Sequence, residues 1–514
     1  MTQGELEQIP QPFVELMSEL EMRIMKDIIE RIKANGFSPA SADWEISRLQ
    51  QLGESEEQIR KWIKEMLEKT DDEVDKIFSD DVYREYYGHD REYQVSGFEQ
   101  IPLEQNVQLL QVIEASKRQT KDTFRNLTAS TGFAIRDPVT KNIVYSPTMK
   151  FYQQTLDAAI MDISAFSYNT VLARTINTMT TSGLRWIDYD SGWHNRVDVA
   201  ARRAVMTGFR QVQGKINEQV AEDLQTDTYE VTYHVGARPT HQPWQGRVWT
   251  MQQLRDICGL GTVTGLHGAN CYHDYKPFIP GVSVRTYTDE QLDQMIKEEN
   301  TPKEYLGKKY TTYEALQAQR RMETRMRKTR QDIRLMQDGG ADSNDITLKK
   351  AKYQGQMQTY KAFSEAMELP EQMERVYQDG LRGKFTPTKT EQKVLEESVI
   401  NDKIKAELSE AKIKGIPKIN PEKVDVSEFT FDTAHINAER EHGVTRAEAE
   451  QFIKEADISL TRWNGRFINY YGPNGATYLD MDNENIRTSF KKEQFDEATL
   501  KIREVAEKYG KRKD

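Results

Sequence analysis

The organisation of this chain is decided by residues 228–285, which include His234-Val-Gly-Ala-Arg238-Pro-Thr-His241-Gln-Pro-Trp244-Gln-Gly246 and Gly265-Leu-His267-Gly-Ala-Asn270-Cys271-Tyr-His273. Long amphipathic patterns precede this stretch, whereas the stretch itself is rich in β-branched residues, aromatics, proline and glycine. Such a change of composition indicates short strands and turns. The clearest strand is predicted over residues 229–234. We therefore expect a small, loop-rich core that contains β-structure.

Helical periodicity dominates the residues before this core. Apolar residues recur at four-residue spacing from Leu16 to Ile28, which predicts an amphipathic helix over 12–35. Ser55 begins a capping-box pattern and predicts the start of a second helix. Further helices are predicted over 104–125, 150–182 and 195–223.

The residues after the core return to helical patterns. A capping box at Thr288 predicts a new helix, and a long charged helix is predicted over 315–336. Glycine and proline in segment 415–421 indicate a linker. Beyond it we predict helix over 433–456, with a capping box at Thr445. A meander with strands at 466–471, 476–480 and 486–490 and a closing helix follow.

These patterns predict an α+β multidomain protein. The predicted domains are a helical region over 1–227, a loop-rich core over 228–285, a charged helical connector over 286–419 and a small α+β domain over 420–514. Only 37% of the 514 residues are hydrophobic and 30% are charged. Because this composition disfavours one large core, we expect compact cores only at about 228–280 and 420–514, with further burial against neighbouring proteins.

Charge is distributed unevenly along the chain. The first hundred residues carry 12 Lys+Arg and 24 Asp+Glu, a balance of -12, against a net charge of -11 for the whole chain. Residues 301–420 have a balance of +6, and residues 421–514 have a balance of -4. Nucleic-acid-binding domains are typically basic, so bulk charge does not favour DNA or RNA as the main partner.

Composition also excludes several protein classes. No run approaches the roughly 18 apolar residues of a membrane span, and the sequence after Met1 lacks the pattern of a secretory signal. Two cysteines, Cys258 and Cys271, are too few for a disulfide framework. We therefore expect no membrane span and a reducing compartment during synthesis.

The motifs of the central stretch closely resemble the phage minor capsid protein 2 family, which is related to head-morphogenesis proteins of the Mu F type. The residues that carry the resemblance include Arg238, His241, Trp244, Gly246, Asn270, Cys271 and His273. The similarity extends over roughly residues 10–340. It implies a virion protein of a tailed bacteriophage that acts at the portal vertex or capsid interior, in head morphogenesis or genome delivery. Portal and capsid proteins are the implied partners, with synthesis in the host bacterial cytoplasm.

The histidines and cysteine of this stretch allow three interpretations. Zinc is held by imidazole and thiolate groups, so His241, His267, Cys271 and His273 are candidate ligands, although their spacing differs from standard zinc motifs. Cys271 with a histidine is also a candidate nucleophilic pair. The third interpretation is a packed core in which histidine and arginine satisfy buried carbonyls and tryptophans fill space. No other cofactor is expected.

The charged helix over 315–336 carries a cluster of arginines. At 100° per residue these spread around much of the helix, which is typical of a solvated helix or one that contacts other proteins. If the protein lies near packaged DNA, the helix is a candidate to neutralise phosphates. The candidate contact residues are Arg320, Arg321, Arg325 and Arg327.

The domain over 420–514 resembles the small barnase, EndoU, colicin and RelE-like nucleases that phages append to minor capsid proteins. A metal-independent ribonuclease needs a base, an acid and cations for the phosphate. The candidate catalytic residues are His435, Arg440, His442, Arg466, Tyr478 and Lys491. The alternative is that the charged groups face solvent and the tyrosines form core. A structural virion protein is thus the main hypothesis, and an RNase toxin acting on RNA is the alternative.

Overall fold

The structure is a computed structural model that describes residues 3–34, 42–136, 140, 142–163, 167–188 and 193–509. The chain forms two compact units, Met1–Thr386 and Pro387–Asp514. This division lies inside the segment predicted as connector, 286–419, so the last part of that segment folds with the second unit. The finer domain boundaries at 227/228 and 285/286 remain predictions.

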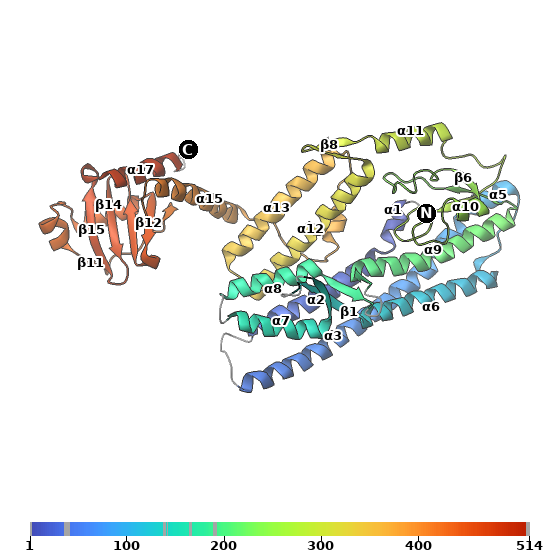
Figure 1. The fold of residues 1–514 in the computed structure, drawn as a ribbon, viewed down its shortest axis with the longest axis horizontal. Coiled ribbons are helices and arrows are strands. Elements are labelled where there is room, and N and C mark those ends of the chain that lie inside the picture. The colour runs from blue at the N-terminus through green and yellow to red at the C-terminus, as the bar shows by residue number, and fades with distance from the viewer. Residues whose placement is uncertain are drawn as a thin grey trace. The chain divides into compact units, whose positions relative to one another are not determined.

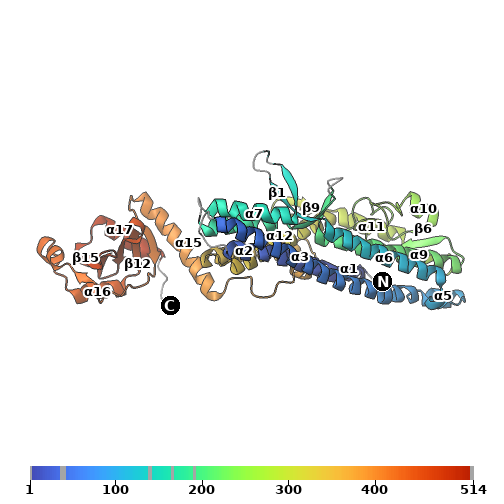
Figure 2. The ribbon, with the colours of Figure 1, turned by 90° about the horizontal axis from the view of Figure 1, so that it is seen from below.

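The first unit is built mainly of helices. They are α1 (Gln3–Gln8), α2 (Gln11–Ala34), α3 (Ala42–Lys76), α4 (Val82–Tyr87), α5 (Asp90–Ser96), α6 (Val107–Ala129), α7 (Thr148–Ile163), α8 (Tyr168–Ser182), α9 (Val197–Asp223), α10 (Met251–Asp256), α11 (Asp289–Asn300), α12 (Thr312–Gly339), α13 (Ser343–Ala366) and α14 (Met373–Tyr377). The long helices α2, α3, α6 and α9 pack side by side, as both Figure 1 and Figure 2 show. None of the described helices is long and apolar enough to span a membrane.

The apolar stripes of these helices meet in one large core. Phe13 of α2, Phe124 of α6 and Phe209 of α9 are fully buried, and the rings of Phe13 and Phe124 stack with centroids 5.2 Å apart. The expectation that compact cores are confined to 228–280 and 420–514 is therefore wrong. Each amphipathic helix buries only one stripe, so a sequence with few apolar residues still fills a core where several stripes converge.

Helix α3 begins at Ala42, well before the start predicted at Ser55. Ser55 is buried within this helix, and its hydroxyl hydrogen-bonds to that of Tyr152 in α7 at 2.8 Å. The capping box predicted there is wrong, because the hydroxyl is used in a contact between helices instead of a cap. The capping boxes predicted at Thr288 and Thr445 are confirmed, and each begins a helix.

A four-stranded antiparallel sheet lies among the helices of the first unit. Its strands are β1 (Thr131–Arg136), β2 (Ile143–Pro147), β3 (Leu184–Ile187) and β4 (His194–Arg196), in the order β2-β1-β3-β4. The sequence did not predict this sheet, and the helix predicted over 150–182 is two helices, α7 and α8. Strands of three to six residues are too short to show a clear alternating pattern.

The loop-rich core contains a three-stranded antiparallel sheet. Its strands are β5 (Thr228–Val231), β6 (Val248–Thr250) and β7 (Tyr275–Phe278), in the order β6-β5-β7. Strand β5 confirms the strand predicted over 229–234. A hairpin of β8 (Lys303–Tyr305) and β9 (Lys308–Tyr310) follows.

The basic helix α12 packs inside the first unit. It contacts α2, α8 and α13, and its Met326 and Ile333 are fully buried. Arg330 is buried as well. Its guanidinium forms a bidentate ion pair with Asp379, at 2.7 Å from Nε to Oδ2 and 3.1 Å from Nη2 to Oδ1. The interpretation of this segment as a solvated helix is therefore wrong, because consecutive residues of its last turns, 329–333 with 335 and 336, are buried inside the first unit.

The second unit is a mixed sheet with helices on both faces. Its helices are α15 (Lys389–Glu410), α16 (Arg446–Glu455) and α17 (Glu497–Tyr509), and its strands are β10 (Ile416–Ile419), β11 (Thr430–Phe431), β12 (Ile458–Arg462), β13 (Phe467–Tyr471), β14 (Gly475–Asp480) and β15 (Asn485–Lys491). The order is β10-β12-β13-β14-β15-β11, antiparallel except for the pair β11 and β15. One apolar cluster lies between the sheet and α16, and another includes residues of α15 and α17. The predicted meander is confirmed as β13, β14 and β15.

Two predictions for this unit are wrong. The segment predicted as a linker, 415–421, contains strand β10, which pairs with β12 at the edge of the sheet. Edge strands tolerate proline, so Pro417 does not prevent pairing. The helix predicted over 433–456 is interrupted between a π-helix, Ala434–Glu439, and α16, with Gly443 at a φ of 58° between them.

Replacing Asp379 by alanine is expected to destabilise the first unit by about 3–5 kcal/mol, because Arg330 then loses its buried counter-charge. The control Asp122→Ala removes one partner of the exposed Arg125–Asp122 pair and should cost at most about 1 kcal/mol. Urea unfolding followed by tryptophan fluorescence measures both, since six of the seven tryptophans precede residue 387. Equal stability losses in the two variants would contradict the central role of the buried pair.

Candidate functional site

Residues 258–271 form a tight hydrogen-bonded loop between α10 and β7. The backbone amide of Ala269 donates to the carbonyl of Val263 at 2.7 Å. Gly265 lets the loop close, since a Cβ atom there would lie 2.2 Å from the carbonyl oxygen of Gly259. This close packing determines where the side chains at the end of the loop are placed.

His241, Cys271 and His273 bring three metal-ligating atoms together. His241 Nδ1 lies 3.4 Å from His273 Nδ1, while Cys271 Sγ lies 3.5 Å from His273 Nδ1 and 3.9 Å from His241 Nδ1. All three side chains are buried. His241 comes from the turns after β5, and the other two residues come just before β7. Three of the four predicted ligands therefore meet.

The outer ring nitrogens of both histidines face oxygen acceptors. His241 Nε2 donates to the backbone carbonyl of Thr264 at 2.8 Å, and His273 Nε2 donates to Gln245 Oε1 at 2.9 Å. The backbone N–H of His234 donates to the same Oε1 at 3.0 Å, which sets the orientation of the Gln245 amide. A neutral imidazole carries one N–H, so the inner Nδ1 atom of each histidine presents a lone pair.

Burial favours the neutral forms of these three side chains. It lowers the pKa of His241 and of His273, and it raises the pKa of the Cys271 thiol. A nucleophilic cysteine acts as a thiolate, and no carboxylate orients either histidine ring. The electrostatics therefore oppose the interpretation of Cys271 as a nucleophile.

His267, the fourth predicted ligand, lies outside this group and bonds to Asp274. His267 Nε2 lies 3.1 Å from Asp274 Oδ1, and the same carboxylate accepts from Gln213 and Asn217 of α9, each at 3.1 Å. Burial alone would raise the pKa of Asp274, but His267 and the Arg210 guanidinium outweigh it and lower that pKa far below its usual range. Asp274 was not among the residues predicted from the sequence, although it directly follows His273.

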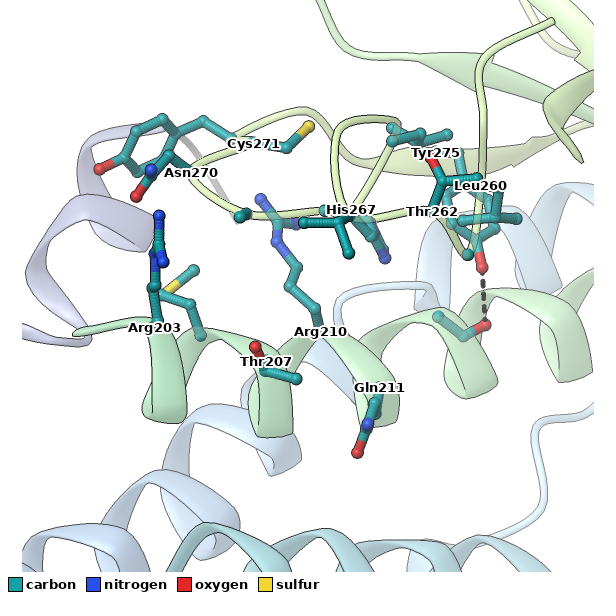
Figure 3. Close-up of a pocket in the computed structure, with 18 of the residues that line it drawn as sticks. Arg203, Thr207, Arg210, Gln211, Leu260, Thr262, His267, Asn270, Cys271 and Tyr275 are labelled. Carbon is teal, nitrogen blue, oxygen red and sulfur yellow. Dashed lines mark hydrogen bonds between the residues drawn. The ribbon is translucent and has the colours of Figure 1, made fainter. Parts of the chain in front are cut away.

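A pocket of about 460 Å³ lies between α9 and this loop. Figure 3 shows Arg210 extending from α9 toward the loop residues His267 and Cys271, with Arg203 further along the same helix. Arg210 is buried, and within the described residues its Nε and Nη2 atoms have no hydrogen-bond partner. A buried arginine in a helix gives no distinctive sequence pattern, so Arg210 could not be predicted from the sequence as a pocket residue.

The remaining motif residues hold the loop in place. Arg238 Nη2 donates to the carbonyl of Ala269 at 2.7 Å, and the Trp244 ring packs on His241 with centroids 4.5 Å apart. Gly246 has a φ of 72° and lies against α11, where a side chain would collide with Leu292. Asn270 adopts a left-handed conformation, which asparagine tolerates better than most residues.

The four arginines predicted to contact DNA occupy different environments on α12. Arg321 and Arg325 are exposed, whereas Arg320 and Arg327 are half-buried. Arg327 Nη1 lies 3.3 Å from Asp198 Oδ2 of α9. Contact with DNA remains a prediction, and only Arg321 and Arg325 are exposed enough to reach a phosphate without rearrangement.

The structure separates the predicted catalytic residues of the second unit. The rings of His442 and Tyr478 both pack on Phe490, each with centroids 5.5 Å apart. Lys491, the next residue, points to the other face of the sheet and pairs with Glu448 of α16 at 3.0 Å. Two further candidates are engaged elsewhere: Arg466 pairs with Asp480 at 3.1 Å, and His435 pairs with Glu439 at 2.9 Å. Arg440 is exposed beside the π-helix.

Arginine and aromatic side chains lie around the start of β13, at one end of the same sheet face as Tyr478. The Phe467 ring has the guanidinium carbons of Arg466 and Arg487 at 4.9 and 5.3 Å from its centroid. Trp463, just before β13, is 80% exposed. Phe467, opposite Asp480, lies on the same strand face as Tyr478. We call Trp463, Arg466, Phe467 and Arg487 the stacking surface.

Comparisons with known proteins place this chain in a family. The sequence profile described as phage minor capsid protein 2 matches residues 1–364. A protein named "Structural protein" from Lactococcus phage LL-H is 21% identical over 297 residues, which are 53% of this chain and 77% of that protein. No solved structure matches the chain. Because the profile covers more than half of the sequence, the chain belongs to the phage minor capsid protein 2 family and is a structural protein of the virion.

Proposed function

We propose that this protein acts at the portal vertex of the phage head, where its first unit binds the portal protein during head assembly or genome delivery. Family membership and the name of the relative from phage LL-H support a place among the structural proteins of the virion. The observation that carries the finer proposal is an exposed apolar surface at one end of the first unit.

We call this region the end surface. It consists of the exposed apolar side chains Tyr83, Val95, Phe98, Ile101, Val107 and Leu110. Hydrogen bonds hold the segment after α5 against α4, since Tyr86 Oη donates to the carbonyl of Ile101 at 2.6 Å and Gln100 Nε2 donates to the carbonyl of Tyr86 at 2.8 Å. Helix α5 lies at one end of the helical body in both views (Figure 1 and Figure 2). These six side chains come from one short part of the sequence, residues 83–110, and exposed apolar patches typically mark interaction sites.

Acidic residues outnumber basic ones among the exposed charged residues of the segments that carry the end surface. Asp80, Asp90, Glu99 and Glu104 are exposed, against Arg84 and Arg91, within a part of the sequence that carries a strong negative balance. Complementary charge steers partners and excludes wrong ones. The partner that fits is therefore an apolar surface with a basic rim on another virion protein.

Replacing Phe98 and Ile101 together by aspartate is expected to weaken binding to the portal protein of the same phage at least about tenfold, because charge would replace the apolar centre of the interface. The control Ile143→Asp changes an apolar residue of the β1–β2 hairpin that is 60% exposed and should leave binding unchanged. Biolayer interferometry with purified proteins measures the dissociation constants. Unchanged binding by the double variant would exclude the end surface as the interface.

A second candidate function is RNA cleavage by the second unit, supported by the stacking surface and the His442 ring. Exposed aromatics beside arginines are typical of surfaces that bind single-stranded nucleic acid. His442 Nδ1 has no hydrogen-bond partner in the described structure, and burial lowers the pKa of His442, which keeps its imidazole neutral near pH 7. A neutral imidazole is a suitable general base for a ribose 2′-hydroxyl.

If the second unit is a ribonuclease, the purified full-length chain should cleave tRNA in the presence of EDTA. His442→Gln is then expected to lower the rate by about 10²–10⁴-fold, which is the usual contribution of a general base. Phe467→Ala should raise KM with little change in kcat, because it removes a ring that stacks on RNA. Gel analysis of tRNA cleavage measures both rates. Equal cleavage by wild type and His442→Gln would exclude His442 as the general base, and no cleavage by the wild-type chain would exclude the ribonuclease.

A further inference from the structure

We propose that the first unit binds a Zn²⁺ ion through His241 Nδ1, Cys271 Sγ and His273 Nδ1, and that this ion joins the turns after β5 to the strand β7. The proposal concerns a metal site and stands independently of portal binding and RNA cleavage. It rests on three observations: the distances between the ligand atoms, the hydrogen bonds of the two imidazole rings and the chemistry of the donor set.

The distances match a tetrahedral zinc centre. Zn–N bonds of 2.0–2.1 Å and Zn–S bonds of about 2.3 Å place two nitrogen ligands about 3.4 Å apart and a nitrogen and a sulfur about 3.5–3.6 Å apart. The two Nδ1 atoms lie 3.4 Å apart, and Cys271 Sγ lies 3.5 and 3.9 Å from them. One ion therefore fits between the three atoms after a shift of a few tenths of an ångström along one edge.

The two imidazole rings are oriented as ligands. Each donates its Nε2–H outward, His241 to the Thr264 carbonyl and His273 to Gln245 Oε1. Both Nδ1 lone pairs therefore face the Cys271 sulfur in a buried space. The single S–H of a neutral thiol can donate to only one of them, which leaves the other without a donor at a cost in free energy unless a cation lies between the three atoms. Metal-ligating histidines typically donate their other N–H to a carbonyl or carboxylate, which orients the ring.

The donor set selects the metal. Two imidazole nitrogens and one thiolate favour Zn²⁺ over Mg²⁺ or Ca²⁺, which prefer oxygen ligands. Cys271 binds as the thiolate, and its proton passes to solvent when the metal is bound. Three protein ligands leave one coordination position for a water molecule.

The site joins two segments that are distant in sequence. His241 precedes Cys271 by 30 residues, and the turns that carry it are also attached to the loop by the hydrogen bond from Arg238 to the Ala269 carbonyl. A metal ion at this site would stabilise the folded loop in its position next to Arg203 and Arg210 of α9. Its contribution is expected to appear as a loss of thermal stability when the metal is removed.

Metal analysis of the full-length chain tests the proposal. After dialysis against zinc sulfate and removal of free metal, mass spectrometry should find about one zinc ion per chain. Cys271→Ser and His273→Gln should lower the zinc content to background. The control Cys258→Ser should keep it, because Cys258 is the other buried cysteine of the same apolar cluster and lies outside the ligand group. Gln245→Leu should weaken zinc binding by about 10–100-fold, since it removes the acceptor that orients His273.

A spectroscopic measurement keeps the test decisive if a variant fails to fold. Co²⁺ added to the metal-free wild-type chain should produce a thiolate-to-cobalt charge-transfer band and the visible bands of a tetrahedral centre, both absent from a folded Cys271→Ser variant. A folded wild-type chain that binds neither zinc nor cobalt would overturn the proposal. Full zinc content in a folded Cys271→Ser variant would overturn it equally.

Discussion

The arrangement of the loop-rich core depends on the hydrogen bonds that the buried carboxylate of Asp274 accepts. It accepts hydrogen bonds from Gln213 and Asn217 on α9 and from His267 on the loop. Its own backbone N–H also donates to the Thr232 hydroxyl at 2.9 Å. A buried carboxylate is costly unless its oxygens are satisfied, so these partners must stay in place together. That requirement holds the loop against α9.

Once the loop is held in this way, the positions of its end residues follow. Cys271 and His273 lie immediately before Asp274, and Arg238 and Trp244 bring the turns that carry His241 against them. The packing that holds the loop next to α9 therefore also determines where the three proposed zinc ligands lie. Arg238, Trp244 and Gly246, which were predicted as motif residues from the sequence, hold this arrangement through their contacts with Ala269, His241 and α11.

The two units form their hydrophobic cores from few apolar residues in different ways. The first unit combines the narrow apolar stripes of many helices, and it still leaves the side chains of the end surface exposed. The second unit places one apolar cluster on each side of a single sheet. On the face that holds His442 and Tyr478, aromatic and arginine side chains remain exposed near the strand ends. Both exposed regions agree with a protein that works in contact with other molecules in the virion.

The sequence by itself determined the fold class, the family motifs, most of the long helices and the three strands of the meander, because their periodicity and turn residues are local properties. It did not reveal the strands β1 to β4, the strand β10 or the burial of α12, since each depends on pairing or packing with distant residues. For the candidate metal site, the sequence named four ligands, but only the tertiary structure separated His267 from the other three. The reason is physical: hydrogen bonds to Asp274, Thr264 and Gln245 orient the histidine rings, and spacing along the chain contains no information about those partners.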